Sequence, residues 1–141
     1  MVRLEICQLL AITKGKWCYM ATEFKVVNNI IRIKGLSKSF DYLIDQVLSR
    51  DGLIFVRLQI PMNIQITPRI AANLIALNER LEVAWVVNWC GISDEFPAFE
   101  ALPLEIMSLN DDGNLEASDF MGRRYRISMD TGTAAIIGAV K

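Results

Sequence analysis

The fold is decided by the stretch from Asn29 to Gly91, which reads NIIRIKGLSK SFDYLIDQVL SRDGLIFVRL QIPMNIQITP RIAANLIALN ERLEVAWVVN WCG. Its apolar residues follow two patterns. Runs rich in β-branched and aromatic residues predict three strands, over Ile30 to Lys34, Leu53 to Ile60 and Val83 to Trp89. Between them, apolar residues at helical spacing predict two helices, over Ser39 to Ser49 and over Pro68 to Leu81.

Each predicted helix has one apolar stripe and signals at its ends. The first stripe consists of Phe40, Leu43, Ile44, Val47 and Leu48. The second consists of Ile70, Leu74, Leu77 and Leu81, with Arg69, Asn73 and Arg80 expected to face water. Ser37 or Ser39 can cap the first helix, and Gly52 supplies a left-handed residue beyond its end. Thr67 is a suitable N-cap for the second helix, and Pro68 suits its first position.

The predicted strands contain continuous apolar runs, which are typical of strands that are covered on both faces. Leu53 to Val56 and Val83 to Val87 are the clearest examples. Parallel strands joined by helices usually have this composition, and right-handed connections would place both helices on one face. We therefore predict an α/β (or α+β) protein with a central βαβαβ unit of mostly parallel strands and helices packed on the sheet. The rest of the chain or a partner must cover the opposite face.

The two flanking parts are expected to add strands to this unit. Residues 2–12 fit either a strand or a helix, Trp17 to Val27 would be a returning strand, and Asn28-Asn29 can form a two-residue turn. The tail predicts strands over Leu104 to Leu109, Leu115 to Phe120 and Tyr125 to Met129, and either a strand or a helix over Thr133 to Val140. No linker is evident, so residues 1–141 are expected to form one domain with parts 1–28, 29–91 and 92–141.

Composition narrows the class of protein. Hydrophobic residues make up 52% of the 141 residues, and the mean hydropathy of +0.29 favours association into a homodimer. A net charge of −1 argues against nucleic acid, and no apolar run reaches the ~20 residues that span a bilayer. We read no signal peptide, and three widely spaced cysteines are typical of reduced thiols in a cytoplasmic protein.

Candidate ligand residues lie in three loops that would follow the strand ends. Gly35, Ser37, Lys38 and Ser39 precede the first predicted helix, where free backbone N–H groups favour an anion, although the spacing is not that of a P-loop. Asn63 and Asn88 come from the next two loops and could complete a phosphate or nucleotide site. The third loop also contains Cys90, Ser93, Asp94 and Glu95. The alternative interpretation is ordinary helix capping and loop solvation.

Four further features have both a functional and a structural interpretation. Arg123, Arg124 and Arg126 surround Tyr125 and would either grip phosphate or form a solvated strand edge next to Asp119 and Asp130. Trp85 and Trp89 share one face of a strand and would either stack on a ligand or partner or pack in the core.

The Asp111-Asp112-Gly113-Asn114 run predicts a hairpin turn, because the closing glutamate of a calcium loop is missing. Cys90 has no histidine to activate it, so a structural thiol is favoured.

Two families resemble parts of the chain. Leu53 to Ile60, the Pro68 helix and Ala84 to Trp89 are similar to the start of a haloacid-dehalogenase-type phosphatase, but Arg57 and Gln59 stand where that family has its Asp-x-Asp pair. The order of elements from Asn29 to Gly91 resembles anti-sigma-factor-antagonist domains, without their phosphorylated Asp-Ser-Ser-Gly loop. Neither resemblance identifies the family of the chain.

The sequence favours a non-enzymatic cytosolic protein that acts through protein contacts, as a possible regulator and a homodimer, with no cofactor. The chain has no histidine, so the commonest general base and zinc ligand is absent, and no nucleophile–base pair can be named. The second hypothesis is a small-molecule or phosphate-binding protein that uses the loops beyond the strand ends. An enzyme is the third.

Overall fold

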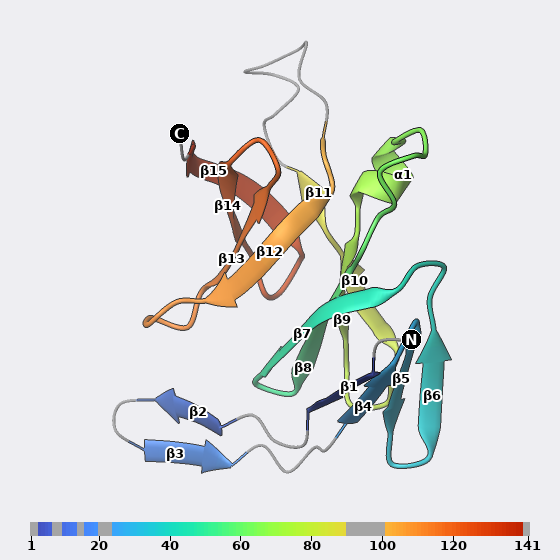
Figure 1. Ribbon diagram of the computed structural model, residues 1–141. Coiled ribbons are helices and arrows are strands. Elements are labelled where there is room, and N and C mark those ends of the chain that lie inside the picture. The colour runs from blue at the N-terminus through green and yellow to red at the C-terminus, as the bar shows by residue number, and fades with distance from the viewer. Residues whose placement is uncertain (1–2, 7–9, 14–15, 20–23, 90–100, 140–141) are drawn as a thin grey trace.

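The computed structural model shows a protein built almost entirely of β-strands, so the predicted α/β class is wrong (Figure 1). The structure describes residues 3–6, 10–13, 16–19, 24–89 and 101–139. These residues contain fifteen strands and one helix of four residues, α1 (Pro68–Ala71). All of their strand pairs are antiparallel except β11 with β15, so the predicted parallel sheet is also wrong.

The strands form three larger sheets and a separate hairpin. The N-terminal sheet has the order β1 (Arg3–Ile6), β4 (Phe24–Val27), β5 (Ile30–Ile33), β6 (Leu36–Ser39). The middle sheet has the order β10 (Val83–Val86), β9 (Leu74–Leu77), β8 (Leu53–Leu58), β7 (Ile44–Arg50). The C-terminal sheet has the order β11 (Asn88–Trp89), β15 (Thr133–Ala139), β14 (Arg123–Ile127), β13 (Leu115–Asp119), β12 (Leu104–Leu109). The hairpin consists of β2 (Leu10–Thr13) and β3 (Lys16–Tyr19).

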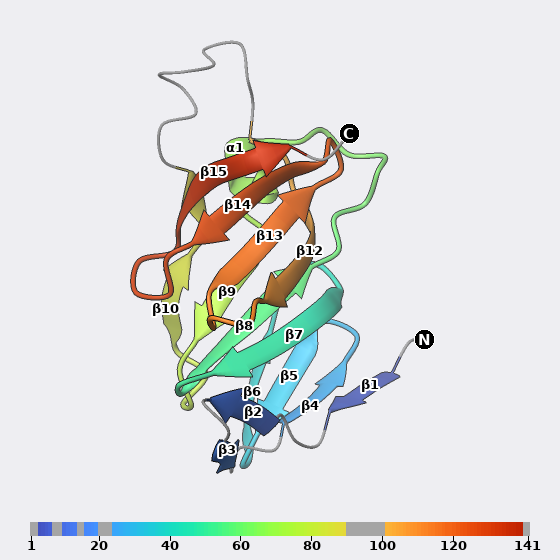
Figure 2. The ribbon, with the colours of Figure 1, turned by 90° about the vertical axis from the view of Figure 1, so that its left-hand side faces the viewer.

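The middle sheet lies between the other two sheets and contributes to both hydrophobic cores (Figure 2). Because side chains alternate along a strand, β8 sends Phe55 into the core shared with the C-terminal sheet and Val56 into the core shared with the N-terminal sheet. In β9, Leu74 and Ile75 divide in the same way. The continuous apolar run of β8 therefore reflects burial on both faces, and an antiparallel strand at the centre of three layers meets that condition.

The first predicted helix is wrong, because most of its residues form β7. A β-bulge in β7 pairs Ile44 with Leu58 and Gln46 with Arg57, and leaves Asp45 as the extra residue. The bulge shifts the strand's alternation by one residue. As a result Ile44 and Val47, three residues apart, are both buried against the N-terminal sheet. This spacing of three imitates the apolar stripe of a helix.

The second predicted helix ends after one turn. Thr67 is its N-cap, as predicted, and accepts a hydrogen bond of 3.2 Å from the backbone N–H of Ile70. Beyond Ala71 the chain becomes β9, in which Leu74 and Leu77 face opposite cores. Their spacing therefore does not define one face of a helix. Asn73, which was expected to face water, is buried.

The predicted strands and turns outside the two helices agree better with the structure. The strand predicted at Leu104 to Leu109 has the bounds of β12, and the Thr133 run is a strand. Asn28 has a φ of 56° in the predicted turn between β4 and β5. The first residues form strands β1 and β2, so the helix considered over residues 2–12 is not formed. Both family resemblances rested on alternating strands and helices, which the described residues do not have.

Candidate functional site

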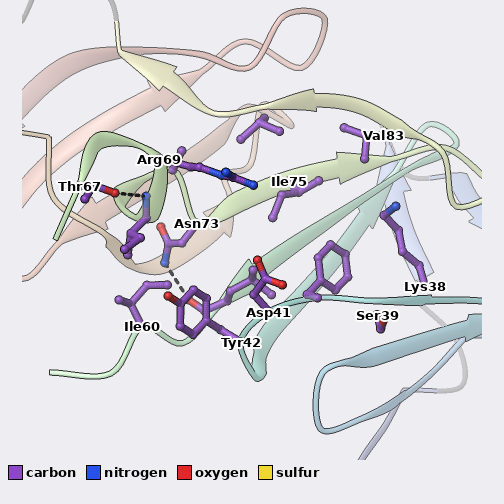
Figure 3. A pocket seen from close by; sticks show the side chains of 15 residues that line it. Lys38, Ser39, Asp41, Tyr42, Ile60, Thr67, Arg69, Asn73, Ile75 and Val83 are labelled. Atoms are coloured by element: carbon purple, nitrogen blue, oxygen red, sulfur yellow. Dashed lines mark hydrogen bonds between the residues drawn. The ribbon is translucent and has the colours of Figure 1, made fainter. Parts of the chain in front are cut away.

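An open cavity of about 680 Å³ lies where the N-terminal sheet leaves part of the middle sheet uncovered (Figure 3). Ile75 of β9 and Val83 and Val86 of β10 line it. The side chain of Ile75 is buried, whereas Val83 is 49% exposed and Val86 is 43% exposed. The cavity therefore has an apolar surface at the free edge of the middle sheet, and this surface will be called the floor.

A second side of the cavity is formed by the end of β6 and the linker to β7, residues 40–43. The lining residues on this side are Lys38, Ser39, Phe40, Asp41 and Tyr42. Hydrogen bonds hold the linker at both ends. The backbone N–H of Phe40 donates to the Asn29 carbonyl over 2.9 Å, and that of Gln59 donates to the Leu43 carbonyl over 2.8 Å. The linker is therefore fixed in place before any ligand arrives.

The third side is α1 and the residues that follow it. Arg69 of α1 is exposed and lines the cavity together with Thr67 and Ile70. Asn73 anchors this side, because its Nδ2 donates to the Leu58 carbonyl over 2.7 Å and to the Leu104 carbonyl over 2.8 Å. The cap of α1 and this buried amide together set the position of Arg69.

Charged groups on the cavity wall are not neutralised by described neighbours. Neither Lys38 nor Arg69 forms an ion pair with a described residue, and the same holds for Asp41. Two cations and one carboxylate leave the wall with a net charge of +1. Elsewhere the described arginines are often engaged, as Arg57 is with Asp45. Two cations that have no ion pair within the described part of the chain favour an occupant with negative charge.

The structure brings together only part of the predicted anion site. Lys38 and Ser39 line the cavity, whereas Gly35 and Ser37 belong to the β5–β6 hairpin and Asn63 to the loop before α1, and none of these three lines it. Asn88 starts β11, and its side chain donates to the carbonyls of Val86 and Thr131. The premise of the prediction is wrong, because residues 37–39 are in a strand and not at a helix N-terminus.

The arginine cluster of β14 is held by carboxylates. Arg123 pairs with buried Asp119 over 2.7 Å, while Arg124 and Arg126 pair with Glu116 over 3.1 and 3.5 Å. Glu116 also accepts a hydrogen bond from Asn110. This bond has the largest effect on the Glu116 carboxyl and, together with the bonds from the two arginines, lowers its pKa. β14 lies inside the C-terminal sheet, so it is not the predicted strand edge. All three arginines therefore pair with carboxylates of the neighbouring strand β13.

The two tryptophans both pack against the core between the middle and C-terminal sheets. Trp85 is buried, and its Nε1 donates to the Met129 carbonyl over 2.7 Å. Trp89 is partly buried against the same core, which agrees with the structural interpretation. Cys7, Cys90 and the Ser93-Asp94-Glu95 loop lie outside the described residues.

Among the described residues, no three histidine, cysteine, aspartate or glutamate side chains lie close enough to hold a metal ion. No helix in the described ranges is long and apolar enough to cross a membrane. Sequence reasoning missed Asp41, Tyr42, Arg69, Val83 and Val86 as cavity residues, because their meeting depends on the stacking of two sheets.

A comparison with protein-family models places the chain in a family, but the description of that family gives no activity. The model of a family described as "Domain of unknown function (DUF7957)" matches residues 21–138. The chain belongs to this family. The match starts ahead of β4 and ends within β15, so every residue of the cavity lies inside the range that characterises the DUF7957 family. No curated protein matches the sequence.

Proposed function

We propose that this protein is a binding module that acts through protein contacts and accepts an extended, acidic segment of a partner protein in the cavity. One observation carries the proposal: the apolar floor at Val83 and Val86 is flanked by Lys38 and Arg69, two cations with no ion pair to a described residue. An extended segment with alternating apolar and acidic residues would place one kind of side chain on the floor and direct the other toward the cations.

The position of the cavity between strand edges favours an extended occupant. β6 is the outermost strand of the N-terminal sheet and β10 the outermost strand of the middle sheet, and both line the cavity. Each therefore has an edge without a strand partner among the described residues. Recognition of an extended peptide at a sheet edge uses main-chain hydrogen bonds for affinity and side-chain pockets for specificity.

The test is an NMR titration of the whole chain with a synthetic peptide of about eight residues, the length of an ordinary strand, in which valine and glutamate alternate. We expect amide shifts at Lys38, Asp41, Arg69 and Val86. A peptide of alternating valine and lysine serves as the charge control and is expected to bind far more weakly. Equal binding of the two peptides, or no shifts at millimolar peptide, would refute the proposal.

Charge-reversal variants assign the effect to the cavity. Lys38→Glu combined with Arg69→Glu is expected to weaken binding of the acidic peptide by about tenfold or more, because each exposed ion pair contributes up to about 1 kcal/mol. The matched control is Arg32→Glu combined with Lys34→Glu, which reverses two exposed charges of the β5–β6 hairpin that do not line the cavity. Equal losses in both proteins would point to long-range charge alone. If inorganic phosphate displaced the peptide at equal concentration, the cavity would be an anion site and the peptide proposal would fail.

A second copy of the chain is the other possible occupant, since the composition predicts a homodimer. Sedimentation at high micromolar concentration separates the two cases. The peptide proposal expects the charge-reversed double variant to keep the oligomeric state of the natural chain. Loss of a dimer in that variant would show that the cavity binds another copy and would overturn the proposal.

A further inference from the structure

A second cavity adjoins the first on the other side of the β6–β7 linker. It has a volume of about 430 Å³ and is lined by Asn29, Asp41, Tyr42, Leu43, Gln59 and Pro61. Asp41 and Tyr42 line both cavities. These two residues therefore form a ridge, with one hollow on each side of it.

The ridge is rigid at its base and open along its backbone. Asn29 holds it by donating from Nδ2 to the Phe40 carbonyl over 2.7 Å, and the N–H of Ile44 donates to the Asn28 carbonyl over 2.9 Å. Between these anchors, the N–H groups of Asp41, Tyr42 and Leu43 have no backbone hydrogen bond to a described residue. Accessible main-chain groups without a backbone partner among the described residues are suited to pair with the main chain of a passing peptide.

The second cavity provides a place for an apolar side chain. Leu43, the last residue of the linker, is 47% exposed on its wall, and Pro61 adds a further apolar surface. No cation lines this cavity among the residues that the structure describes, since its other side chains are Asn29, Gln59, Asp41 and Tyr42. It therefore differs in chemistry from the first cavity and would not attract a second acidic group.

We propose that the partner segment crosses the Asp41–Tyr42 ridge, so that its acidic part lies in the first cavity and an apolar residue from its other part lies against Leu43 and Pro61 in the second. This inference rests on the proposed function and specifies the partner as a segment with two recognition elements. Rigid, preformed surfaces reduce the ordering cost of such binding. The acidic part supplies charge complementarity, and the apolar residue supplies an anchor.

The experiment compares five peptides on the whole chain by isothermal titration calorimetry. The first is the valine–glutamate peptide, and the other four extend it at one end or the other by a short linker that ends in leucine or in serine. The leucine extension at one end is expected to tighten binding by about tenfold, as burial of an apolar side chain does, whereas the serine extension should not. Extensions that give no gain at either end would overturn this inference and leave the proposed function standing.

Single substitutions test whether the gain in affinity from the leucine extension arises at the second cavity. Leu43→Ser is expected to abolish the gain from the leucine extension and to leave the affinity of the short peptide unchanged. Leu36→Ser is the matched control, because Leu36 is also 47% exposed but lines neither cavity. Persistence of the gain in Leu43→Ser, or its equal loss in Leu36→Ser, would refute the inference. Failure of the short peptide to bind would refute both this inference and the proposed function.

Discussion

Asn73 and Leu104 exchange two hydrogen bonds across the boundary between the middle and C-terminal sheets. The side-chain Nδ2 donates to the Leu104 carbonyl, the Leu104 N–H donates to the side-chain Oδ1, and each distance is 2.8 Å. The amide thus pairs with Leu104 as a residue of a neighbouring strand would. A third bond, from Nδ2 to the Leu58 carbonyl, ties β8 to the same point.

Replacing the Asn73 side chain is expected to lower the free energy of unfolding, and in the aspartate variant this free energy should depend on pH. Asn73→Ala leaves the Leu104 N–H without its acceptor, removes a donor from the carbonyls of Leu58 and Leu104, and should lower the free energy of unfolding by about 3 kcal/mol. Asn73→Asp faces two carbonyl oxygens, so its folded pKa should rise above the ordinary value of about 3.9. Its stability should therefore be greater at pH 5 than at pH 8. Urea denaturation at both pH values is the measurement, and a pH-independent Asp variant would contradict the expectation.

Leu74 is expected to be a large contributor to stability. Its side chain is fully buried in the core between the middle and C-terminal sheets. Leu74→Ala should lower the free energy of unfolding by about 2–5 kcal/mol, since it removes buried groups and leaves a void. Arg69→Ala, which removes an exposed side chain of α1, is the control and should change the free energy of unfolding little. Similar losses in both variants would be inconsistent with the placement of β9.

Alanine substitutions at Gly132 and Gly35 distinguish the cost of backbone strain from the cost of a steric clash. Both have positive φ, 76° and 82°, so alanine is strained at either position. A Cβ on Gly132 would come within 2.3 Å of the Trp85 ring, whereas a Cβ on Gly35 meets nothing within 4 Å. Gly35→Ala should cost about 1 kcal/mol and Gly132→Ala clearly more. Tryptophan fluorescence should shift only in Gly132→Ala; an unchanged spectrum would show that the ring has room to adapt.

Tyr125 should weaken the fold at high pH. Burial, and then the charge of Asp119, raise the pKa of its phenol to about 12. The unfolded phenol ionises near pH 10, so stability from this group is present below pH 10 and is lost as the pH rises toward 12. Spectrophotometric titration should show one of the three tyrosines ionising about two units late. Tyr125→Phe should remove that step, and a persistent late step would assign it elsewhere.

Glu116 should contribute to the pH dependence of stability below pH 4.5. Its hydrogen bond from Asn110, followed by those from Arg124 and Arg126, lowers its pKa below 4.5. A lowered folded pKa contributes stability that is present above pH 4.5 and is lost as the pH falls through the folded value. Glu116→Gln should therefore flatten the decline of the melting temperature below pH 4.5. A decline as steep as that of the natural chain would show that other carboxylates dominate.

The sequence predicts most strands and turns but neither the layers nor the cavity. Runs such as Leu53 to Ile60 report strand propensity directly, and Thr67-Pro68 reports a helix start that the structure confirms. The predicted helix over β7 failed because one extra residue, Asp45, converts a spacing of two into a spacing of three. Periodicity has no means of separating a bulged strand from a short amphipathic helix.

The sequence pattern could not predict strand direction, or which distant residues lie close together, for a different reason. An apolar run reports burial on both faces, and both a parallel sheet and the centre of three stacked sheets provide it. Lys38 and Arg69 were visible as cations, but their approach to Val83 depends on how much of the middle sheet the N-terminal sheet covers. That extent is set by tertiary packing and not by any local signal.

The shared middle sheet also has a consequence for synthesis of the chain on the ribosome. β4 to β10 are made before β12 to β15, so the sheet can form while the residues that cover its second face are still missing. During that interval Phe55, Leu74 and Trp85 have no partners from the C-terminal sheet. Exposed apolar surface on a nascent chain promotes aggregation and chaperone binding. The delay until residues 104–139 emerge is therefore the period of greatest risk for this fold.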